Sequence, residues 1–188
     1  MEAKRAACGS CVTMTMALAM ASGASRSVPV YSDSSGMPFD AIDEQFMRLA
    51  LELARRGEGS GEVPVGAVVV VGGEIVGSGF NSPIANHDPT AHAEILALRE
   101  AAARLANYRL EQATLYATLE PCVMCAGALV NARVRRLVFG ARDLRFGGVR
   151  SKFRLADSEV LNHRVEVVEG VLAVECVELL REFFGQKR

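Results

Sequence analysis

The sequence contains the continuous apolar run Val63-Pro64-Val65-Gly66-Ala67-Val68-Val69-Val70-Val71, which is followed by Gly72-Gly73. Because the β-branched residues continue through odd and even positions, the run predicts a strand that is buried on both faces. Two consecutive glycines are typical of a two-residue hairpin turn, and Glu74 to Phe80 is then expected to return as the paired strand. The fold is therefore expected to be organised around a sheet that is covered on both sides.

The segments on either side of this hairpin alternate between helical and strand-like patterns. Apolar residues recur with a period near 3.6 from Asp40, which suits an N-cap, to Gly57, which suits a helix stop. Residues 81–89 and 142–158 are expected to be loops. Further helices are expected over residues 91–106, 121–131 (beginning at Pro121) and 171–184, and further strands over 113–119, 136–141 and 165–169. This alternation predicts an α/β protein with a mixed sheet of about five strands.

The composition is that of a single domain with a sizeable core. The chain has 188 residues, of which 50% are hydrophobic. The formal net charge of −1 does not by itself require a nucleic-acid or membrane partner, and no apolar run approaches the roughly 20 residues of a membrane span. The five cysteines are scattered and odd in number, so they do not suggest a disulfide framework, and we expect a reducing compartment.

Residues 1–37 differ in composition from the rest of the chain and are rich in Ala, Ser, Met and Gly. We expect this segment to be a disordered extension and residues 38–188 to form the folded domain. Lys4 and Arg5 precede a mildly apolar run, which leaves a secretory signal, a transit peptide, or sequence upstream of a true start at Met37 as alternatives.

Two short motifs combine residues that bind metals. They are Asp88-Pro89-Thr90-Ala91-His92-Ala93-Glu94 and Glu120-Pro121-Cys122-Val123-Met124-Cys125. Cys122 and Cys125 are three residues apart, so on one helix they project to the same side, and a helix N-terminus favours their thiolate forms. With His92 they supply three zinc ligands. A structural site has four, so the set leaves a position for water and predicts a hydrolytic Zn²⁺ site.

Glu94, two residues after His92, is the candidate acid–base residue. If Thr90 is the N-cap of the following helix, the acid of a capping box would be residue 93, which is Ala93. Glu94 is therefore not explained as a cap and is predicted to move protons between water and substrate. Zinc with such a carboxylate suits hydrolytic deamination of an aromatic amidine such as adenine or cytosine. The alternative is a surface acid that is favoured by the helix dipole.

Other interpretations of the cysteines are open. Cys122 and Cys125 could be a dithiol redox pair, and a second C-x-x-C, Cys8 to Cys11, could complete a four-cysteine structural site. Either would leave the histidine and the acid of the first motif without a role, and a non-catalytic binding module stabilised by zinc would have no use for that acid. Cys176, on the apolar side of the last predicted helix, is expected in the core.

Positive charge is concentrated in one segment. Between residues 133 and 154, eight cations accompany a single acid, Asp143: Arg133, Arg135, Arg136, Arg142, Arg145, Arg150, Lys152 and Arg154. Such a patch predicts contacts with RNA phosphates, although a solvated loop whose arginines pair with acids elsewhere is the alternative. Phe146 and Phe153 within it could stack on unpaired bases, or belong to the core or to a dimer contact.

The two motifs and their surroundings resemble the bacterial tRNA-specific adenosine deaminases, the TadA family of the cytidine deaminase-like superfamily. The resemblance covers about residues 40–184. It is carried by the two motifs and by Val63-Pro64-Val65-Gly66-Ala67, Asn81-Ser82-Pro83-Ile84, Val138 to Asp143, Asn162-His163, Glu175-Cys176 and Phe183-Phe184. The zinc ligands alone mark the superfamily, whereas the full motifs, the second extended to Ala128, are typical of the tRNA adenosine branch.

This resemblance implies a three-layer α/β/α cytidine deaminase-like fold and one Zn²⁺ per subunit of a cytoplasmic homodimer. It implies hydrolytic deamination of the wobble adenosine, position 34 of the anticodon, to inosine, mainly in an arginine tRNA. His92, Cys122 and Cys125 match the zinc ligands, and Glu94 matches the proton shuttle. Four positions match substrate-binding residues: Asn81, which would hydrogen-bond the flipped base, Asp143, which would lie beside the preceding nucleotide, and Ala93 and Arg145.

Two departures from the family pattern concern RNA binding. Gly147-Gly148-Val149-Arg150-Ser151 places Val and Arg where the family has small residues, and the tail Phe183 to Arg188 is less basic than is common. The nearest rival function is deamination of a free base or nucleoside, guanine or cytosine. The basic segment favours RNA, because a small substrate does not need such a surface.

Overall fold

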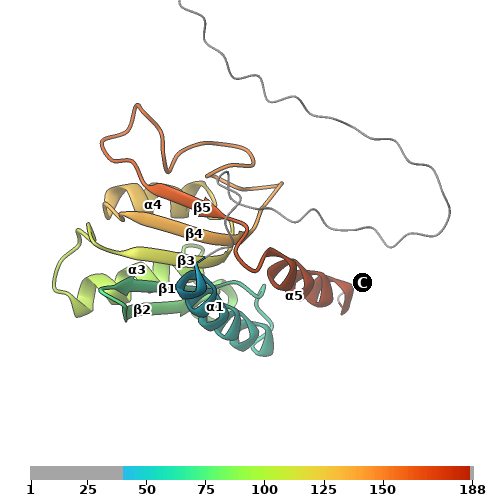
Figure 1. Cartoon of the computed structure of the whole chain (residues 1–188). Helices are drawn as coiled ribbons and strands as arrows, with labels where there is room; N and C mark the ends of the chain where they lie inside the picture. The colour runs from blue at the N-terminus through green and yellow to red at the C-terminus, as the bar shows by residue number, and fades with distance from the viewer. Residues whose placement is uncertain (1–39, 187–188) are drawn as a thin grey trace, which may run out of the picture.

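The computed structural model describes residues 40–186, and Figure 1 shows their arrangement. The disordered extension predicted for residues 1–37, and with it the pair Cys8 and Cys11, lies outside the described residues. The described helices and strands form one central sheet with helices on its two faces. Among residues 40–186, no helix has the length and apolar character needed to span a membrane.

The sheet has five strands in the order β2-β1-β3-β4-β5. They are β1 (Gly66–Val71), β2 (Glu74–Phe80), β3 (Thr114–Leu119), β4 (Arg136–Ala141) and β5 (Glu166–Glu169). β1 pairs antiparallel with both β2 and β3, whereas β3, β4 and β5 run parallel. The prediction of a mixed sheet of about five strands is confirmed.

The hairpin between β1 and β2 turns at Gly72 and Gly73, as predicted. Their φ angles are 60° and 87°, in the left-handed region that glycine enters without a steric penalty. β1 begins at Gly66 rather than at Val63, because Pro64 has no N–H to offer a neighbouring strand.

Two helices cover each face of the sheet. α1 (Ala41–Gly59) and α5 (Ala173–Gln186) pack on one face, and α3 (Ala93–Arg104) and α4 (Val123–Asn131) pack on the other. Side chains of the central strands alternate between the two cores: Val68, Tyr116 and Val138 face α1, and Val69, Leu115 and Leu137 face α3. The three-layer α/β/α fold is therefore confirmed, and it explains why β1 is apolar at every position.

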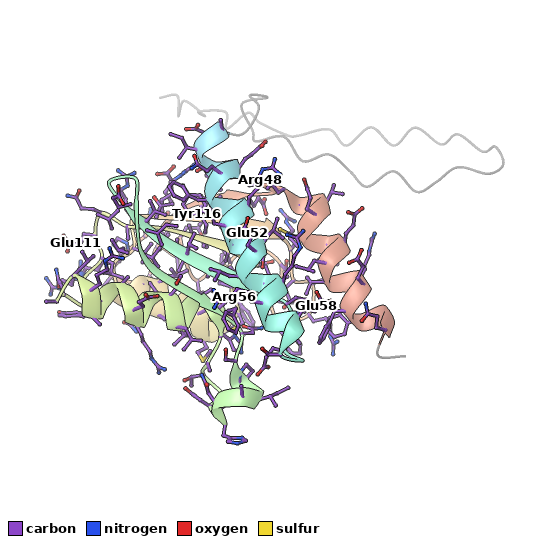
Figure 2. The ribbon with its side chains drawn as sticks, turned by 90° about the horizontal axis from the view of Figure 1, so that it is seen from below. Arg48, Glu52, Arg56, Glu58, Glu111 and Tyr116 are labelled. Atoms are coloured by element: carbon purple, nitrogen blue, oxygen red, sulfur yellow. The ribbon has the colours of Figure 1, made fainter. Side chains whose placement is uncertain are left out.

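α1 shows the amphipathic pattern that its sequence predicts. Arg48, Glu52 and Arg56 of this helix, labelled in Figure 2, are exposed. Met47 and Ala50 are fully buried against the sheet. The apolar stripe of this helix therefore closes one face of the sheet.

The start of α1 agrees with the prediction, and smaller differences from the predicted boundaries lie at its C-terminal end and after β2. The Oδ1 atom of Asp40 accepts the N–H of Ile42 at 3.0 Å, which confirms the predicted N-cap. The helix continues to Gly59, past the predicted stop at Gly57. A short helix, α2 (Pro83–Asn86), lies within the segment predicted to be a loop.

α3 begins two residues later than predicted. It starts at Ala93 with His92 in the N-cap position, so the expectation of a helix from Ala91 with Thr90 as its N-cap is wrong. The reason is Asp88, whose Oδ1 atom accepts bonds of 2.7 Å from both the N–H and the hydroxyl of Thr90. These bonds hold Thr90 in a turn ahead of the helix, and His92 thereby becomes the residue from which the helix starts.

α4 also begins later than predicted, at Val123 rather than at Pro121. The carbonyl oxygen of Pro121 accepts the N–H of Gly148 at 2.8 Å, and Cys122 forms a β-bridge with Gly147. Pro121 and Cys122 are therefore held by the loop after β4, and Cys122 takes the N-cap position.

Candidate active site

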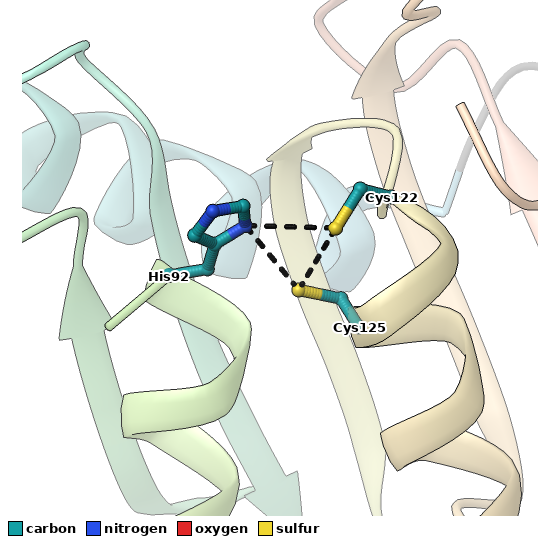
Figure 3. A group of neighbouring side chains, drawn as sticks. All are labelled: His92, Cys122 and Cys125. Atoms are coloured by element: carbon teal, nitrogen blue, oxygen red, sulfur yellow. Dashed lines mark hydrogen bonds between the residues drawn. The ribbon is translucent and has the colours of Figure 1, made fainter. Parts of the chain in front are cut away.

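Three side chains meet between the starts of α3 and α4: His92, Cys122 and Cys125 (Figure 3). His92 and Cys122 are the N-cap residues of their helices, and Cys125 lies in the first turn of α4. The Nδ1 atom of His92 is 3.6 Å from each sulfur, and the two sulfurs are 3.7 Å apart. Within residues 40–186 this is the only cluster of three or more His, Cys, Asp or Glu side chains close enough to hold a metal ion.

These distances fit zinc. Zn–S and Zn–N bonds of about 2.3 Å and about 2.05 Å in a tetrahedron separate two sulfurs by about 3.8 Å and a sulfur from a nitrogen by about 3.6 Å. The observed separations are 3.7 Å and 3.6 Å. Three ligands leave one tetrahedral position open, so this donor set suits a catalytic Zn²⁺ site rather than a structural one.

The pKa values of the two cysteine thiols are shifted in opposite directions. The Cys125 thiol donates a hydrogen bond to Cys122, and this bond, assisted by His92 and opposed by burial, lowers the pKa of Cys122 to about 4. The same hydrogen bond, together with burial, raises the pKa of Cys125. Cys122 is therefore a thiolate at neutral pH, and a divalent cation would supply the charge needed to ionise Cys125.

Glu94 lies in the first turn of α3 and is only 3% exposed. Its Oε2 atom has no hydrogen-bond partner among the described residues, and burial raises the pKa of the carboxyl group. The alternative of a surface acid is therefore wrong. A buried carboxylate oxygen that the protein leaves unpaired is positioned for a ligand or for proton transfer.

Glu94, His92 and Cys122 line a cavity of about 740 Å³, a size typical of small-molecule sites. Polar and apolar groups share its wall. Charged and amide side chains come from the ends of β2 and β3 and from the loop after β4, and the apolar side chains include Leu119, Leu144, Phe146, Leu180 and Phe184. Sequence patterns did not identify Leu144, Leu180 or Phe184, because α5 and the loop after β4 approach the site only in the folded chain.

Asn81 connects the end of β2 to the start of α3. Its Oδ1 atom accepts a hydrogen bond of 3.0 Å from the N–H of Ala93, and its side chain lines the cavity. Ala93 is fully buried and contributes this backbone N–H rather than a side chain in the wall. The fold therefore brings Asn81 to the site with its carboxamide oriented, and the substrate contacts of both residues stay predictions.

Asp143 and Arg145 lie on the loop after β4, and both line the cavity. The Oδ1 atom of Asp143 accepts the N–H groups of Arg145 and Phe146 at 2.8 and 3.1 Å, so this side chain shapes the loop. The guanidinium of Arg145 lies 5.2 Å from the centroid of the Phe146 ring, within the range of a cation–π contact. Their contacts with nucleotides stay predictions.

Sequence patterns also did not assign a role to two buried glutamates, Glu62 and Glu120, which are 1% and 2% exposed, and of which Glu120 lines the cavity. The Oε1 atom of Glu62 accepts the N–H groups of Ile84 and Ala85, both at 2.9 Å, and so holds the start of α2. Glu120 does the same for the loop after β4. One signal was available for Glu120: an acid that directly follows an apolar strand has to find hydrogen-bond donors.

The basic segment, residues 133–154, is not a continuous field of unpaired charge. Four of its eight cations form ion pairs: Arg136 with Asp43, Arg142 with Glu169, and Arg150 and Arg154 with Asp157. The alternative in which arginines pair with acids elsewhere is confirmed for these four. Arg145 makes no ion pair with the described part of the chain, and it lines the cavity.

The two phenylalanines of this segment are both exposed, Phe146 by 62% and Phe153 by 54%. The interpretation of either residue as part of the core is therefore wrong. Phe146 lines the cavity, whereas Phe153 does not. Of the two, Phe146 is the one placed to contact a base that approaches the site.

Comparison with known proteins agrees with this geometry. Residues 40–141 match the family described as the cytidine and deoxycytidylate deaminase zinc-binding region. The matched range contains His92, Glu94 and both cysteines of the cluster. The fold and the site therefore define the class of protein, a zinc-binding deaminase.

Individual relatives narrow the class. The tRNA-specific adenosine deaminase of Haemophilus influenzae is 53% identical over 148 residues, which are 78% of this chain and 86% of the relative. A structure from studies of A-to-I editing by tRNA:A34 deaminases at the wobble position has a TM-score of 0.70 and 42% identity, covering 72% of this chain and 98% of that one. A guanine deaminase from Nitrosomonas europaea has a TM-score of 0.67 and 30% identity, covering 76% of this chain and 84% of that one. The chain belongs to the tRNA-specific adenosine deaminase family of zinc-binding deaminases.

Proposed function

We propose that the protein catalyses the zinc-dependent hydrolysis of the wobble adenosine, position 34 of a tRNA anticodon, to inosine and ammonia. The observation that carries this proposal is the meeting, in one cavity, of three ligands at tetrahedral spacing and the unpaired carboxylate oxygen of Glu94. A structural metal site has no use for such a carboxylate. This chemistry can hydrolyse several aromatic amidines. We choose adenosine in tRNA as the substrate because the chain belongs to the tRNA-specific adenosine deaminase family.

His92, Cys122 and Cys125 would hold the Zn²⁺ ion. When bound, the ion supplies a water nucleophile at neutral pH, because a divalent cation lowers the pKa of a water ligand. Two thiolates and a neutral imidazole carry two negative charges, which offset the charge of the ion. Both cysteines lie at the start of α4, where the dipole of the helix N-terminus favours the thiolate forms.

Glu94 would move the protons. Its carboxylate takes a proton from the attacking water and gives it to the ring nitrogen N1 of adenine. It then transfers a second proton from the new hydroxyl group to the departing amine. One water molecule is consumed, the C6–N bond breaks, a C6=O bond forms and ammonia leaves. Burial raises the pKa of this carboxyl group, which favours the protonated form through which the shuttle passes.

Asn81, Ala93, Asp143 and Arg145 would bind the substrate. Because the Oδ1 atom of Asn81 accepts the N–H of Ala93, we assign its Nδ2 group to a hydrogen bond with the base. Asp143 and Arg145 lie on one loop of the cavity wall, where they are placed for the nucleotide beside the target. Ala93 acts through its backbone, by orienting Asn81.

An RNA substrate suits the wall of the cavity better than a free base does. Leu144, Phe146 and Phe184 are exposed apolar side chains in that wall, and Arg145 adds a positive charge. Unpaired RNA bases stack on such side chains, and phosphates attract the cation. Deamination of free guanine is the second candidate, because the chain is also similar to a guanine deaminase.

The deciding experiment incubates zinc-loaded protein with the anticodon stem-loop of an arginine tRNA that has adenosine at the wobble position. We expect inosine at that position, and none in a matched stem-loop with the adenosine moved to the next nucleotide. Ammonia from free guanine or cytosine, without inosine in the RNA, would establish the second candidate instead.

We further propose that the enzyme is a cytoplasmic homodimer with one Zn²⁺ per subunit and acts on an arginine tRNA. The resemblance to the TadA family supports the dimer and the arginine tRNA, and a tRNA substrate supports the compartment. Light scattering should give about twice the 20.1 kDa of the chain, and a mass of one chain would reject the dimer. Comparing stem-loops of different tRNAs should show the fastest inosine formation in the arginine stem-loop.

A further inference from the structure

Glu120 accepts hydrogen bonds from five donors of one short segment. It directly follows β3 and is almost completely buried. Its Oε1 atom accepts the N–H groups of Val149, Arg150 and Ser151 at 3.1, 2.7 and 2.9 Å. Its Oε2 atom accepts the N–H of Asp143 at 3.1 Å and the hydroxyl of Ser151. A carboxylate has about four acceptor sites, so this side chain has none left for a substrate.

Two glycines allow this segment, here called the wall loop (residues 143–151), to pack closely on the residues beside it. A Cβ atom on Gly147 would lie 2.4 Å from Cδ of Glu120, and one on Gly148 would lie 2.9 Å from the backbone carbon of Cys122. Gly147 also forms a β-bridge with Cys122. The wall loop is therefore in direct contact with both the carboxylate and a zinc ligand.

The wall loop has two parts. Asp143, Leu144, Arg145 and Phe146 line the cavity together with the zinc ligands His92 and Cys122, whereas residues 147–151 supply most of the contacts with Glu120. The first part of the loop thus forms the substrate wall. The second part is held by Glu120, which precedes the zinc ligand Cys122 by two residues in the chain. A displaced anchor would move the wall relative to the metal.

We infer that Glu120 is a positioning residue that holds the wall loop in place relative to Cys122 and thereby sets the affinity for the RNA substrate. The inference about affinity rests on the proposed function, whereas the anchoring of the loop does not. Glu120→Gln tests it, because an amide keeps the size of the side chain but replaces one acceptor oxygen by a donor. Either the pair of donors at one oxygen or the three at the other then lose their partner.

The first measurement needs no RNA. In zinc-loaded full-length Glu120→Gln, amide hydrogen exchange at residues 143 and 149–151 should accelerate at least about tenfold. The amides of Ile84 and Ala85, which are held by Glu62, are internal controls and should keep their rates. Unchanged exchange in the wall loop would overturn the inference.

The second measurement is kinetics on the anticodon stem-loop. Glu120→Gln should raise KM at least about tenfold, keep kcat within about threefold and keep about one zinc per chain, because the wall contacts the RNA and not the reacting atoms. Loss of zinc, or a lower kcat with an unchanged KM, would overturn the inference. If the wild-type enzyme makes no inosine, the proposed function fails, and the exchange measurement still decides whether Glu120 anchors the loop.

A matched pair of glycine variants tests the same anchor without changing Glu120. These variants keep the inference testable if Glu120→Gln does not fold. Gly147→Ala inserts a methyl group between the wall loop and the carboxylate, and it should reproduce the faster exchange and the higher KM. Gly127→Ala adds the same methyl group to α4, where nothing lies within 4 Å, and should change neither. Equal behaviour of the two variants would contradict the role of the anchor.

Discussion

The N–H of Ala93 donates a 3.0 Å hydrogen bond to Oδ1 of Asn81 and joins the end of β2 to the first residue of α3. The same helix begins at His92, the proposed zinc ligand, and carries Glu94 in its first turn. Asn81 therefore has a structural role at the start of this helix besides the role we propose for it with the base. The two roles use different atoms and can be separated.

Asn81→Asp keeps the acceptor for Ala93 but removes the amide donor, whereas Asn81→Ala removes both. We expect Asn81→Asp to keep its zinc and to lose about tenfold in kcat/KM, because a hydrogen bond from a neutral amide to the base is worth about 0.5–1.5 kcal/mol. Asn81→Ala should lose activity and also melt at a lower temperature. Wild-type activity of Asn81→Asp would show that the amide does not contact the base.

Glu94→Gln should abolish turnover without destabilising the protein. The buried carboxylate has an unpaired oxygen and a pKa raised by burial, so a neutral amide of the same shape is easier to bury. Loss of the proton shuttle should lower kcat by about 10²–10⁴-fold. Metal analysis should still find about one zinc per chain, and the melting temperature should be at or above that of the wild type. Near-normal turnover would remove Glu94 from its assigned role.

Zinc removal should lower the melting temperature, because the ion joins the starts of two helices that are held on opposite sides of the cluster. At a zinc concentration 100 times the dissociation constant, the bound ion stabilises the fold by about 2.7 kcal/mol. Cys125→Ser should reproduce the melting temperature of chelated wild-type protein and should not respond to added zinc.

Cys176→Ala is the matched control for that measurement. Cys176 is 1% exposed and lies in the core, as predicted, and it is not part of the metal cluster. Its substitution should leave zinc content and the response to a chelator unchanged, with a modest loss of stability from the smaller side chain. A loss of zinc in this variant would show that the cluster needs more than its three ligands.

Charge reversal should weaken RNA binding at Arg145 and not at Arg135. Arg145 lines the cavity, whereas Arg135 is an exposed cation of the same segment that does not. Both substitutions to Glu change the net charge equally, so a difference between them reports contact rather than general attraction. Arg145→Glu should reduce the salt dependence of RNA binding by about one unit of slope if it removes one phosphate contact. Equal salt slopes for the two variants would reject a contact at Arg145.

Short-range sequence signals account for much of this structure. The period of apolar residues predicted α1, and the Gly72-Gly73 pair predicted the hairpin, because both depend on neighbours in the chain. Cys122 and Cys125 were assigned to one helix face by their spacing alone. The predicted starts of α3 and α4 were too early. Asp88 and the wall loop form hydrogen bonds with residues just ahead of the two helices and hold them outside the helices.

Contacts between distant segments could not be deduced in this way. Arg136 pairs with Asp43, 93 positions earlier in the chain, and this pairing removes it from the basic patch that the sequence suggests. Glu120 bonds to donors 23 to 31 positions later; its place directly after an apolar strand shows that it needs hydrogen-bond donors but not which segment supplies them. The apolar wall of the cavity could not be deduced from the sequence either, because it forms only where α5 and the loop after β4 come together in the fold.

The amino-acid sequence by itself determined the order of the main elements, the three candidate zinc ligands and the candidate acid, because these follow from residue type, periodicity and spacing along the chain. Only the tertiary structure decided that the three candidate ligand atoms stand at tetrahedral distances, that the Glu94 carboxylate is buried with an oxygen unpaired among residues 40–186, and which arginines pair with an acid in that range. The physical reason is that burial and pairing depend on which surfaces the sheet brings together, and those surfaces come from segments far apart in the chain.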